Sequence, residues 1–386
     1  MGFEKNSVPL TSMLSSKASR LKVPISGTFE LSPVCNFTCK MCYVRKTKKE
    51  VEAHHRPMVT LAQWLEIARE AREQGMLFLL LTGGEPFMWP EFWELYEALI
   101  KMGFVISINT NGSLIDDAAI ERLTRYPPKR LNITLYGASD ETYEALCGVK
   151  GVFGKIDQTI RKLKEAGIIV KLNSSMTPSN VQDMEKIISY AKENELVLEM
   201  ATYMFPPIRR DENMVGENHR FTPEEYGSSH LRRYRLQYGE ERYFEMLENI
   251  KKRAVPPPGL DESCRDPLDG RIRCRAGSAA FWVTWDGYLT PCGMMPKPQI
   301  DLYQKNFSAG WKELTEVSEK LCLSGVCEKC QNRELCHTCA AIATAETGDA
   351  GGIPTYLCKT VEVFQKIAET DLADLDKEIK GKGNRE

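Results

Sequence analysis

Hydrophobic and polar residues follow two alternating patterns between residues 27 and 202. Short apolar runs typical of buried strands are separated by stretches whose apolar residues recur three and four positions apart, as in helices that cover a sheet. One such helix is expected to begin after the N-cap Thr60, with Gln63 three residues later, and to end at Gly75. The expected strands are Thr28–Leu31, Leu77–Leu81, Phe104–Asn109, Leu131–Tyr136, Ile168–Asn173 and Leu196–Thr202.

Regular alternation of strands and helices predicts an α/β fold with a parallel sheet and right-handed crossovers. Six strand–helix units are too few for the usual eight-fold barrel. We therefore predict a partial, splayed (β/α)6 barrel of the TIM type. The loops at the carboxyl ends of its strands are expected to form the active face.

The chain after residue 204 is less periodic. A charged helical stretch is expected around Arg232–Lys252, and a last helix over Thr360–Ile379 follows a region rich in cysteine. A small domain organised by bound metal is the expected structure of that region. The predicted divisions are an N-terminal extension (1–26), the partial barrel (27–204), a bridging segment (205–262), the cysteine-rich domain (263–365) and a C-terminal helix and tail (366–386).

Composition and charge narrow the class of protein. A chain of 386 residues with 42% hydrophobic and 27% charged residues is globular and long enough for two or three domains. The formal net charge of -2 gives no reason to expect a nucleic acid or an anionic membrane as partner. The sequence has neither an apolar run of about 20 residues nor the apolar core of a signal peptide. We therefore expect a cytoplasmic protein.

The thirteen cysteines are the most informative residues. Their odd number and the missing export signal favour metal binding over disulfides. Three lie near the start of the chain, and nine lie between Cys264 and Cys358. Cys147 stands alone and is expected to be a buried apolar residue.

The first group, Cys35, Cys39 and Cys42, directly follows the first expected strand. Three thiolates are one short of a closed zinc or iron–sulfur site, so they leave a metal position open for a substrate or cofactor. The alternative is a zinc knuckle completed by His54 or His55, which lie in a Lys-rich segment.

A second motif supports the first. The spacing Cys-x3-Cys-x2-Cys after a first strand resembles the signature of radical S-adenosylmethionine (SAM) enzymes, and Thr82–Pro86, after the second strand, is similar to the GGEP motif of that family. Glycines let a backbone approach a ligand closely, and Glu85 can accept a hydrogen bond from an ammonium group. An ordinary Gly-Gly turn is the alternative.

The resemblance implies that the three cysteines hold a [4Fe–4S] cluster whose fourth iron binds SAM. Asn109–Gly112 and Thr134–Gly137 resemble stretches that line the SAM pocket, and Met41 stands where the family usually has an aromatic residue near the adenine. The implied cofactor-binding residues are Met41, Thr82, Gly83, Gly84, Glu85, Asn109, Thr134 and Asn173.

The second cysteine group is similar to the SPASM extension of radical SAM enzymes, which holds two auxiliary [4Fe–4S] clusters. One of these clusters has only three matched cysteines. Its expected fourth ligand is Cys264, with Cys322 as the competitor, and without a fourth ligand this cluster has an open iron. Structural zinc at the CxxC pairs is the alternative. The resemblance assigns Cys274, Cys292 and Cys339 to the auxiliary cluster with three matched cysteines, and Cys327, Cys330, Cys336 and Cys358 to the other auxiliary cluster.

The resemblance also implies a reaction. Such an oxidoreductase cleaves SAM to a 5′-deoxyadenosyl radical, which removes hydrogen from an unactivated C–H bond. The expected substrate is a ribosomally made peptide, which is cross-linked or dehydrogenated, and the expected electron donor is a protein such as flavodoxin or ferredoxin. The resemblance assigns no catalytic side chain. Arginines such as Arg209 and Arg210 are candidates to bind peptide carboxylates.

Three other functions are weighed against this one. Sulfatase maturases have an Asp after the cysteine that corresponds to Cys292, and Gly293 occupies that place here, which argues against that activity. A radical SAM dehydrogenase of a sugar or cyclitol is the alternative within the class. An iron–sulfur electron carrier or zinc-stabilised binding protein, which does not cleave SAM, is the alternative outside it.

Overall fold

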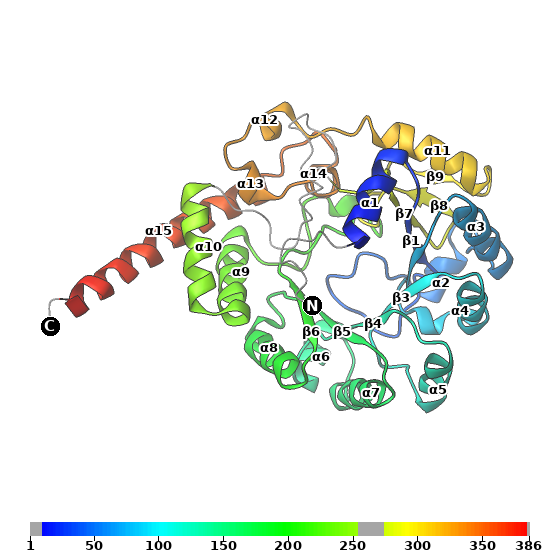
Figure 1. Ribbon diagram of the computed structural model, residues 1–386, viewed down its shortest axis with the longest axis horizontal. Coiled ribbons are helices and arrows are strands. Elements are labelled where there is room, and N and C mark those ends of the chain that lie inside the picture. The colour runs from blue at the N-terminus through cyan, green and yellow to red at the C-terminus, as the bar shows by residue number, and fades with distance from the viewer. Residues whose placement is uncertain (1–9, 254–273, 384–386) are drawn as a thin grey trace, which may run out of the picture.

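The computed structural model describes residues 10–253 and 274–383 (Figure 1). Its centre is a nine-stranded sheet in the order β6-β5-β4-β3-β2-β1-β7-β8-β9. The first six strands are parallel and lie within two residues of their expected positions. They are β1 (Ser26–Glu30), β2 (Phe78–Thr82), β3 (Val105–Thr110), β4 (Arg130–Thr134), β5 (Val170–Ser175) and β6 (Val197–Ala201).

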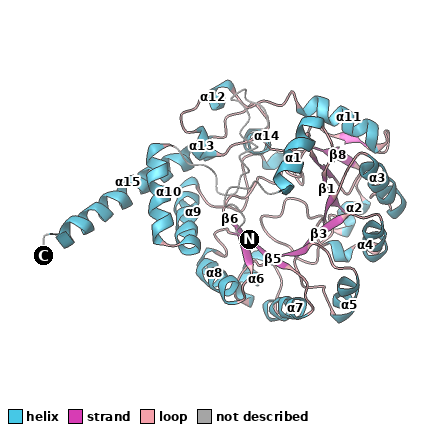
Figure 2. Ribbon diagram, viewed as in Figure 1, coloured by secondary structure: helices cyan, strands magenta, loops and turns pink. Residues whose placement is uncertain are grey.

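Helices follow these strands and surround the curved sheet, as Figure 2 shows. The predicted partial barrel is thereby confirmed. Side chains alternate on each strand: Ile106 and Ile108 of β3 are buried in the main apolar core, and Ser107 and Asn109 lie on the other face. The helices are α2 (Lys48–Glu52), α3 (Leu61–Glu73), α4 (Phe92–Lys101), α5 (Asp117–Arg125), α6 (Asp140–Cys147), α7 (Phe153–Glu165) and α8 (Met184–Glu193).

The cysteine-rich region shares the barrel's sheet. Its first strand, β7 (Ala280–Val283), pairs in parallel with β1, and β8 (Tyr288–Thr290) and β9 (Ile300–Asp301) follow in antiparallel order. Helix α11 (Phe307–Ser318) buries Phe307 in the main core. The C-terminal region therefore extends the barrel at β1. Short helices α12 (Gly325–Glu328), α13 (Arg333–Cys336) and α14 (Ala340–Thr347) complete it.

A second apolar core lies beside the barrel. The bridging segment forms two helices, α9 (Pro223–Tyr238) and α10 (Glu240–Lys252), where the sequence predicted one charged stretch. Both pack against α15 (Thr355–Gly383), which begins five residues earlier than expected and extends away from the body (Figure 1). The N-terminal extension contains α1 (Leu10–Leu21).

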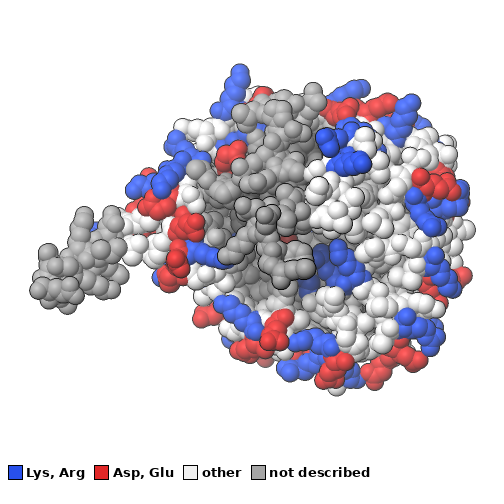
Figure 3. All heavy atoms as spheres, in the orientation of Figure 1, with Lys and Arg blue, Asp and Glu red and all other residues white. Residues whose placement is uncertain are grey.

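On the face seen in Figure 3, basic and acidic side chains alternate around the rim of the described residues. No helix in the described part of the chain combines the length and the apolar character needed to cross a membrane.

Candidate functional site

The loop from Cys35 to Cys42 lies at the carboxyl end of β1 and is fixed by the end of α6. The backbone N–H of Thr38 donates to the carbonyl of Cys147 at 2.8 Å, and that of Lys40 donates to the carbonyl of Leu146 at 3.0 Å. The last carbonyls of a helix have no partner within it, so they are free to hold another segment. Here they hold the cysteine loop.

Cys147 also contacts the loop through its side chain. It is fully buried, as predicted, and its thiol hydrogen-bonds to Cys39. This hydrogen bond is the main cause that lowers the pKa of Cys39 below its usual value, and a hydrogen bond from Tyr136 adds to it. A thiol with a lowered pKa is more readily available as the thiolate that binds metal.

An asparagine network joins the loop to the end of β3. Asn111 Nδ2 donates to Asn36 Oδ1 at 2.9 Å and points to Cys35 Sγ at 3.8 Å, and Asn36 Nδ2 donates to Ser113 Oγ at 2.8 Å. The sequence singled out Asn109–Gly112, but not the partners of Asn111. Asn36, the residue after Cys35, was the signal that could have indicated this network.

The two glycines of the GGEP-like turn pack against the segment that leads into the cysteine loop. The N–H of Gly84 donates to the carbonyl of Ser32 at 2.7 Å. A Cβ at Gly83 would lie 2.4 Å from that carbonyl oxygen, and a Cβ at Gly84 would lie 2.4 Å from the carbonyl oxygen of Val34. The sequence analysis expected these glycines to let the backbone come close to a ligand. In the structure, the group that they approach closely is the protein's own backbone at Ser32 and Val34.

Glu85 is completely buried. Its carboxylate accepts hydrogen bonds from Thr110 Oγ1 and the Asn111 N–H, both at 2.8 Å, and from the Phe87 N–H at 3.3 Å. Burial raises its pKa to about 7. The sequence assigned this carboxylate to an ammonium group, but in the structure both of its oxygens accept from the protein and join the turn after β2 to the end of β3.

The other predicted SAM contacts lie around the same end of the barrel or in its core. Met41 is buried in the main core, and the Thr82 carbonyl accepts from Leu31 N–H at 2.9 Å. Asn109 Oδ1 accepts from Asn132 Nδ2 at 2.7 Å. These side chains stay predictions as cofactor contacts.

The carboxyl ends of β4 and β5 meet the chemical needs of a polar cofactor. Thr134 pairs with Asn173 in the register of these strands. Asn173 Oδ1 is buried and has no hydrogen-bond partner in the described chain. A buried acceptor without a partner is costly, and a ligand hydroxyl or ammonium group would satisfy it. The residues present therefore fit SAM at this end of the barrel.

Four C-terminal cysteines, Cys327, Cys330, Cys336 and Cys358, are close enough for their charges to act on one another's pKa, and their assignment to one cluster stays a prediction. Burial and the negative charges of Cys358 and Cys330 raise the pKa of Cys327. Burial and the charges of Cys358, Cys327 and Cys330 raise the pKa of Cys336 to about 12. A bound metal reverses this effect, because a coordinating thiol is deprotonated.

Of the remaining auxiliary cysteines, Cys292 and Cys339 lie together against one small apolar cluster. Burial and the charge of Cys292 raise the pKa of Cys339, so these two thiols are neighbours. Cys274 and Cys322 are exposed, and Cys264 lies outside the described residues. The fourth ligand of this group therefore stays a prediction.

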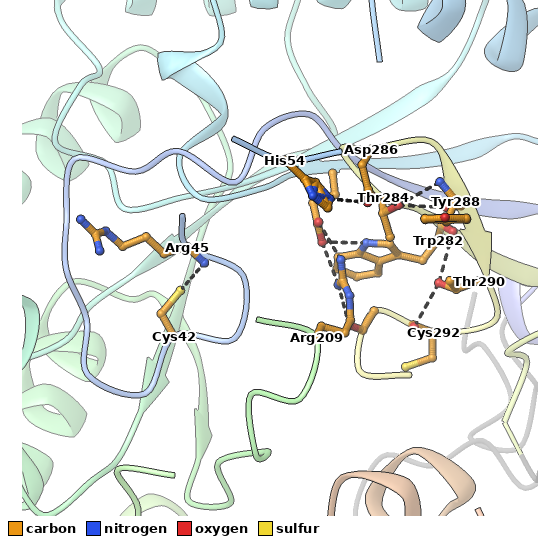
Figure 4. Close-up of polar contacts among 12 residues, drawn as sticks. Cys42, Arg45, His54, Arg209, Trp282, Thr284, Asp286, Tyr288, Thr290 and Cys292 are labelled. Atoms are coloured by element: carbon orange, nitrogen blue, oxygen red, sulfur yellow. Dashed lines mark hydrogen bonds and ion pairs between the residues drawn. The ribbon is translucent and has the colours of Figure 1, made fainter. Parts of the chain in front are cut away.

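The zinc alternatives require a site at which several side chains bind one metal ion. Within residues 10–253 and 274–383, no three His, Cys, Asp or Glu side chains are grouped so that they could hold a metal ion. Thiolate ligands of a four-iron cluster each bind a different iron, so they stand farther apart than the ligands of one ion. His54, considered for a zinc knuckle, lies with its Nε2 3.3 Å from Asp286 Oδ2 (Figure 4).

Arg209 is committed to a buried ion pair, which corrects its predicted role in binding a peptide carboxylate. Its Nη1 and Nη2 donate to Glu30 at 2.9 and 2.8 Å, and Nη1 also donates to the Gly293 carbonyl at 2.7 Å. Trp282 Nε1 donates to the same carboxylate at 2.9 Å. Arg209 thereby fixes the turn after Cys292 to the end of β1 (Figure 4).

The same contacts bring the two cysteine regions together. Burial, followed by the charge of Glu30, raises the pKa of Tyr43, and the charges of Cys42 and Cys292 contribute in the same direction. Tyr43 therefore lies within electrostatic reach of both cysteines. Sequence reasoning missed this junction, which is formed by residues distant along the chain.

Comparison with known proteins defines the class. Residues 29–191 match the radical SAM superfamily, and this range contains the cysteine loop and most of the barrel, but not β6. This part of the chain is a radical SAM domain, and the family uses a [4Fe–4S] cluster together with SAM. The cysteine-rich region fits the auxiliary-cluster extension found in relatives.

Three similar proteins illustrate the relationship. The AdoMet-dependent heme synthase of Methanosarcina barkeri is 25% identical over 83% of this chain and 92% of its own length. The sporulation killing factor maturation protein SkfB of Bacillus subtilis is 25% identical over 72% of this chain and 62% of its own length. SuiB of Streptococcus suis, solved with the precursor peptide SuiA, has a TM-score of 0.61 at 17% identity and covers 93% of this chain and 84% of SuiB.

Proposed function

We propose that this protein is a radical SAM oxidoreductase that cross-links or dehydrogenates a ribosomally made peptide. The observation that carries the proposal is the junction of the two cysteine regions. The loop with Cys35, Cys39 and Cys42 follows β1, and Cys292 follows β8 of the same sheet, with Arg209 between them. An oxidation needs an electron acceptor near the site where hydrogen is removed, and the position of Cys292 near the cysteine loop supports such a role for a cluster that it would help to hold.

The relatives support a peptide substrate. SkfB is a maturation protein for a sporulation killing factor, and SuiB has been solved with a precursor peptide. We extend this substrate class to the present chain, with a flavodoxin- or ferredoxin-like donor in the cytoplasm.

The chain's own residues have defined tasks in this proposal. Cys35, Cys39 and Cys42 would hold the cluster, which together with SAM supplies one-electron cleavage of SAM and removal of a hydrogen atom from the substrate. Asn111 orients the start of the cysteine loop, and α6 fixes its middle. Asn173 would position a polar group of SAM at the end of β5.

Isotope transfer tests the proposal. Anaerobic, reconstituted protein is incubated with SAM, dithionite and a precursor peptide encoded beside its gene, and 5′-deoxyadenosine is measured by mass spectrometry. We expect the peptide to stimulate 5′-deoxyadenosine release and a peptide deuterated at its reactive carbon to transfer deuterium. Stimulation by a polyol such as myo-inositol, and not by the peptide, would move the assignment to the sugar or cyclitol dehydrogenase. No cleavage of SAM at all would overturn the enzyme assignment.

A second candidate function is suggested by the share of each relative's length that aligns with this chain. The heme synthase aligns with 92% of its own length, whereas SkfB aligns with 62%. A tetrapyrrole is therefore the alternative substrate class. Titration of the protein with haem, followed by the visible absorbance of the haem, separates the peptide from the tetrapyrrole assignment. A saturable spectral shift at one haem per chain, without peptide-dependent cleavage of SAM, would favour haem synthesis.

A further inference from the structure

A cavity of about 630 Å³ lies at the edge of the sheet formed by β6. Its walls come mainly from β6, α9, α10, α13 and α15. None of its lining residues belongs to the cysteine loop 35–42 or to the turn 82–86. The cavity is therefore separate from the radical SAM site described above.

The walls of this cavity are mostly aromatic and aliphatic. Tyr226 and Phe364 lie with their ring centres 6.0 Å apart, and Tyr203 lies beside Tyr226 at 6.2 Å. Met246 and Leu357 contribute aliphatic surface. Pockets for small organic ligands are typically of roughly 300–1,000 Å³, with apolar and aromatic walls and a few fixed polar groups. The cavity has this character.

Arg233 of α9 is the main fixed polar group. Its Nη1 donates to Gln237 Oε1 at 2.8 Å, and its Nη2 lies 3.5 Å from His230 Nε2. Its Nε is buried and finds no hydrogen-bond partner among the described residues. Within the described chain, no carboxylate lies within ion-pair distance of this guanidinium. A desolvated cation without a counter-charge is costly, and a bound anion would offset that cost.

Glu199, the carboxylate in the described lining, does not neutralise Arg233. Glu199 is paired with Lys171, so the charges of these two side chains offset each other. Burial and the cation of Arg233 lower the pKa of His230 to about 3, so this ring is neutral near pH 7. Its Nδ1 faces Thr202 Oγ1 at 3.0 Å. Arg233 is therefore the cation of the described lining that has no paired carboxylate among the described residues.

We propose that this cavity binds an organic monoanion, namely a carboxylate carried by an aromatic or aliphatic body. The carboxylate would contact Arg233, whose planar guanidinium matches its geometry, and the apolar body would lie among the tyrosine and phenylalanine side chains. A free acid and the C-terminal carboxylate of a short peptide share this chemistry. The ligand would lie beside Cys336, which also lines the cavity.

Calorimetric titration with a matched pair of probes tests the proposal. The anaerobic, reconstituted full chain is titrated with 4-phenylbutyrate and with its neutral amide, 4-phenylbutyramide, in the absence of SAM. We expect one acid to bind per chain and the amide to bind at least about tenfold more weakly, because the amide lacks the charge. Equal affinities for acid and amide would overturn the proposal.

Two neighbouring arginines of α9 provide matched variants. Arg233→Gln is expected to weaken binding of 4-phenylbutyrate by at least about tenfold. Arg232→Gln removes a half-exposed charge that lies 3.8 Å from Glu185, and is expected to leave binding unchanged. Unchanged affinity in Arg233→Gln, or equal losses in both variants, would overturn the proposal.

A cavity-filling variant covers the case in which Arg233→Gln does not fold. Met246→Trp keeps Arg233 but adds volume in the lining, on α10, so it is expected to abolish binding while the circular dichroism spectrum stays native. Native-like binding by this variant would contradict the assigned cavity.

Titration with acetyl-Leu-Phe and with its C-terminal amide identifies the source of the carboxylate. Tighter binding of the peptide acid than of 4-phenylbutyrate indicates the C-terminal carboxylate of a peptide, and weaker binding indicates a free acid. These measurements do not depend on cleavage of SAM.

Discussion

Glu85 links protonation to folding at the scale of one residue. Its pKa is about 7 in the folded protein and about 4.5 in an unfolded chain. Between these values the folded state keeps the proton and the unfolded state has lost it, so the contribution of Glu85 to the free energy of unfolding falls as pH rises. The groups facing its carboxylate are Thr110 and the N–H groups of Phe87 and Asn111.

Glu85→Gln should remove this pH dependence. We expect the free energy of unfolding of the variant, minus that of the wild type, to increase from pH 4.5 to pH 7 and to level off above pH 7. Anaerobic urea unfolding at several pH values measures this difference. A difference that stays constant across the interval would show that Glu85 has its ordinary pKa.

Residues close together in the sequence were predictable, and contacts between distant residues were not. Cys35, Cys39 and Cys42 lie in one short loop, so their spacing reports their chemistry directly. Arg209 lies next to another arginine in a charged segment, which is typical of solvent-exposed residues. Only the fold brings it to Glu30, 179 positions away.

At the scale of elements, the turn after β2 depends on the absence of a side chain. Gly84→Ala would place Cβ 2.4 Å from the Val34 carbonyl oxygen, which is backbone and has little freedom to move. We expect a loss of about 1–3 kcal/mol in the free energy of unfolding, typical of overpacking. Denaturant unfolding measures the loss, and weaker SAM binding should accompany it because Val34 adjoins the cysteine loop.

Gly154→Ala is the matched control. Gly154 lies in α7, and a Cβ there meets no atom of the described residues within 4 Å. Alanine in a helix is more favourable than glycine by about 0.5–1 kcal/mol, so this variant should be neutral or slightly stabilised. Similar losses in the two variants would contradict the steric account of Gly84.

The long elements were predictable because burial leaves a regular pattern. Strands β1–β6 and the helices between them were expected from their periodicity, and the structure confirms them. Strands β7–β9 have four, three and two residues, too few for a period to emerge. Helices α9 and α10 were read as one because Gly239, which separates them, is a single residue in a continuous charged stretch.

At the scale of the whole molecule, the two cysteine regions should load iron independently. Changing Cys35, Cys39 and Cys42 together to Ala is expected to lower the iron content from about twelve to about eight per chain and to abolish SAM cleavage. Cys327, Cys336 and Cys358 lie in α12, α13 and α15, and Cys292 follows β8, so we expect these cysteines to bind iron without that loop. Iron and acid-labile sulfide measure the change.

Cys147→Ala controls for disturbance of the loop. Cys147 hydrogen-bonds to Cys39 but is not a predicted ligand, so this variant should keep its full iron content. Loss of all iron in the triple variant would refute independent loading, and loss of four irons in Cys147→Ala would make Cys147 necessary for the first cluster.

The pairing of β7 with β1 also has a consequence for synthesis. Ser26 pairs with Ala280, so about 250 residues separate the two partners. At roughly 5–20 residues per second, a ribosome needs about 12–50 s to supply the second strand. During that interval one edge of β1 is unpaired, and the nascent chain carries an exposed template for aggregation just before its cysteine loop. Pairing of β7 with β1, rather than completion of the six-stranded barrel, is therefore the step after which iron can be loaded without that edge exposed.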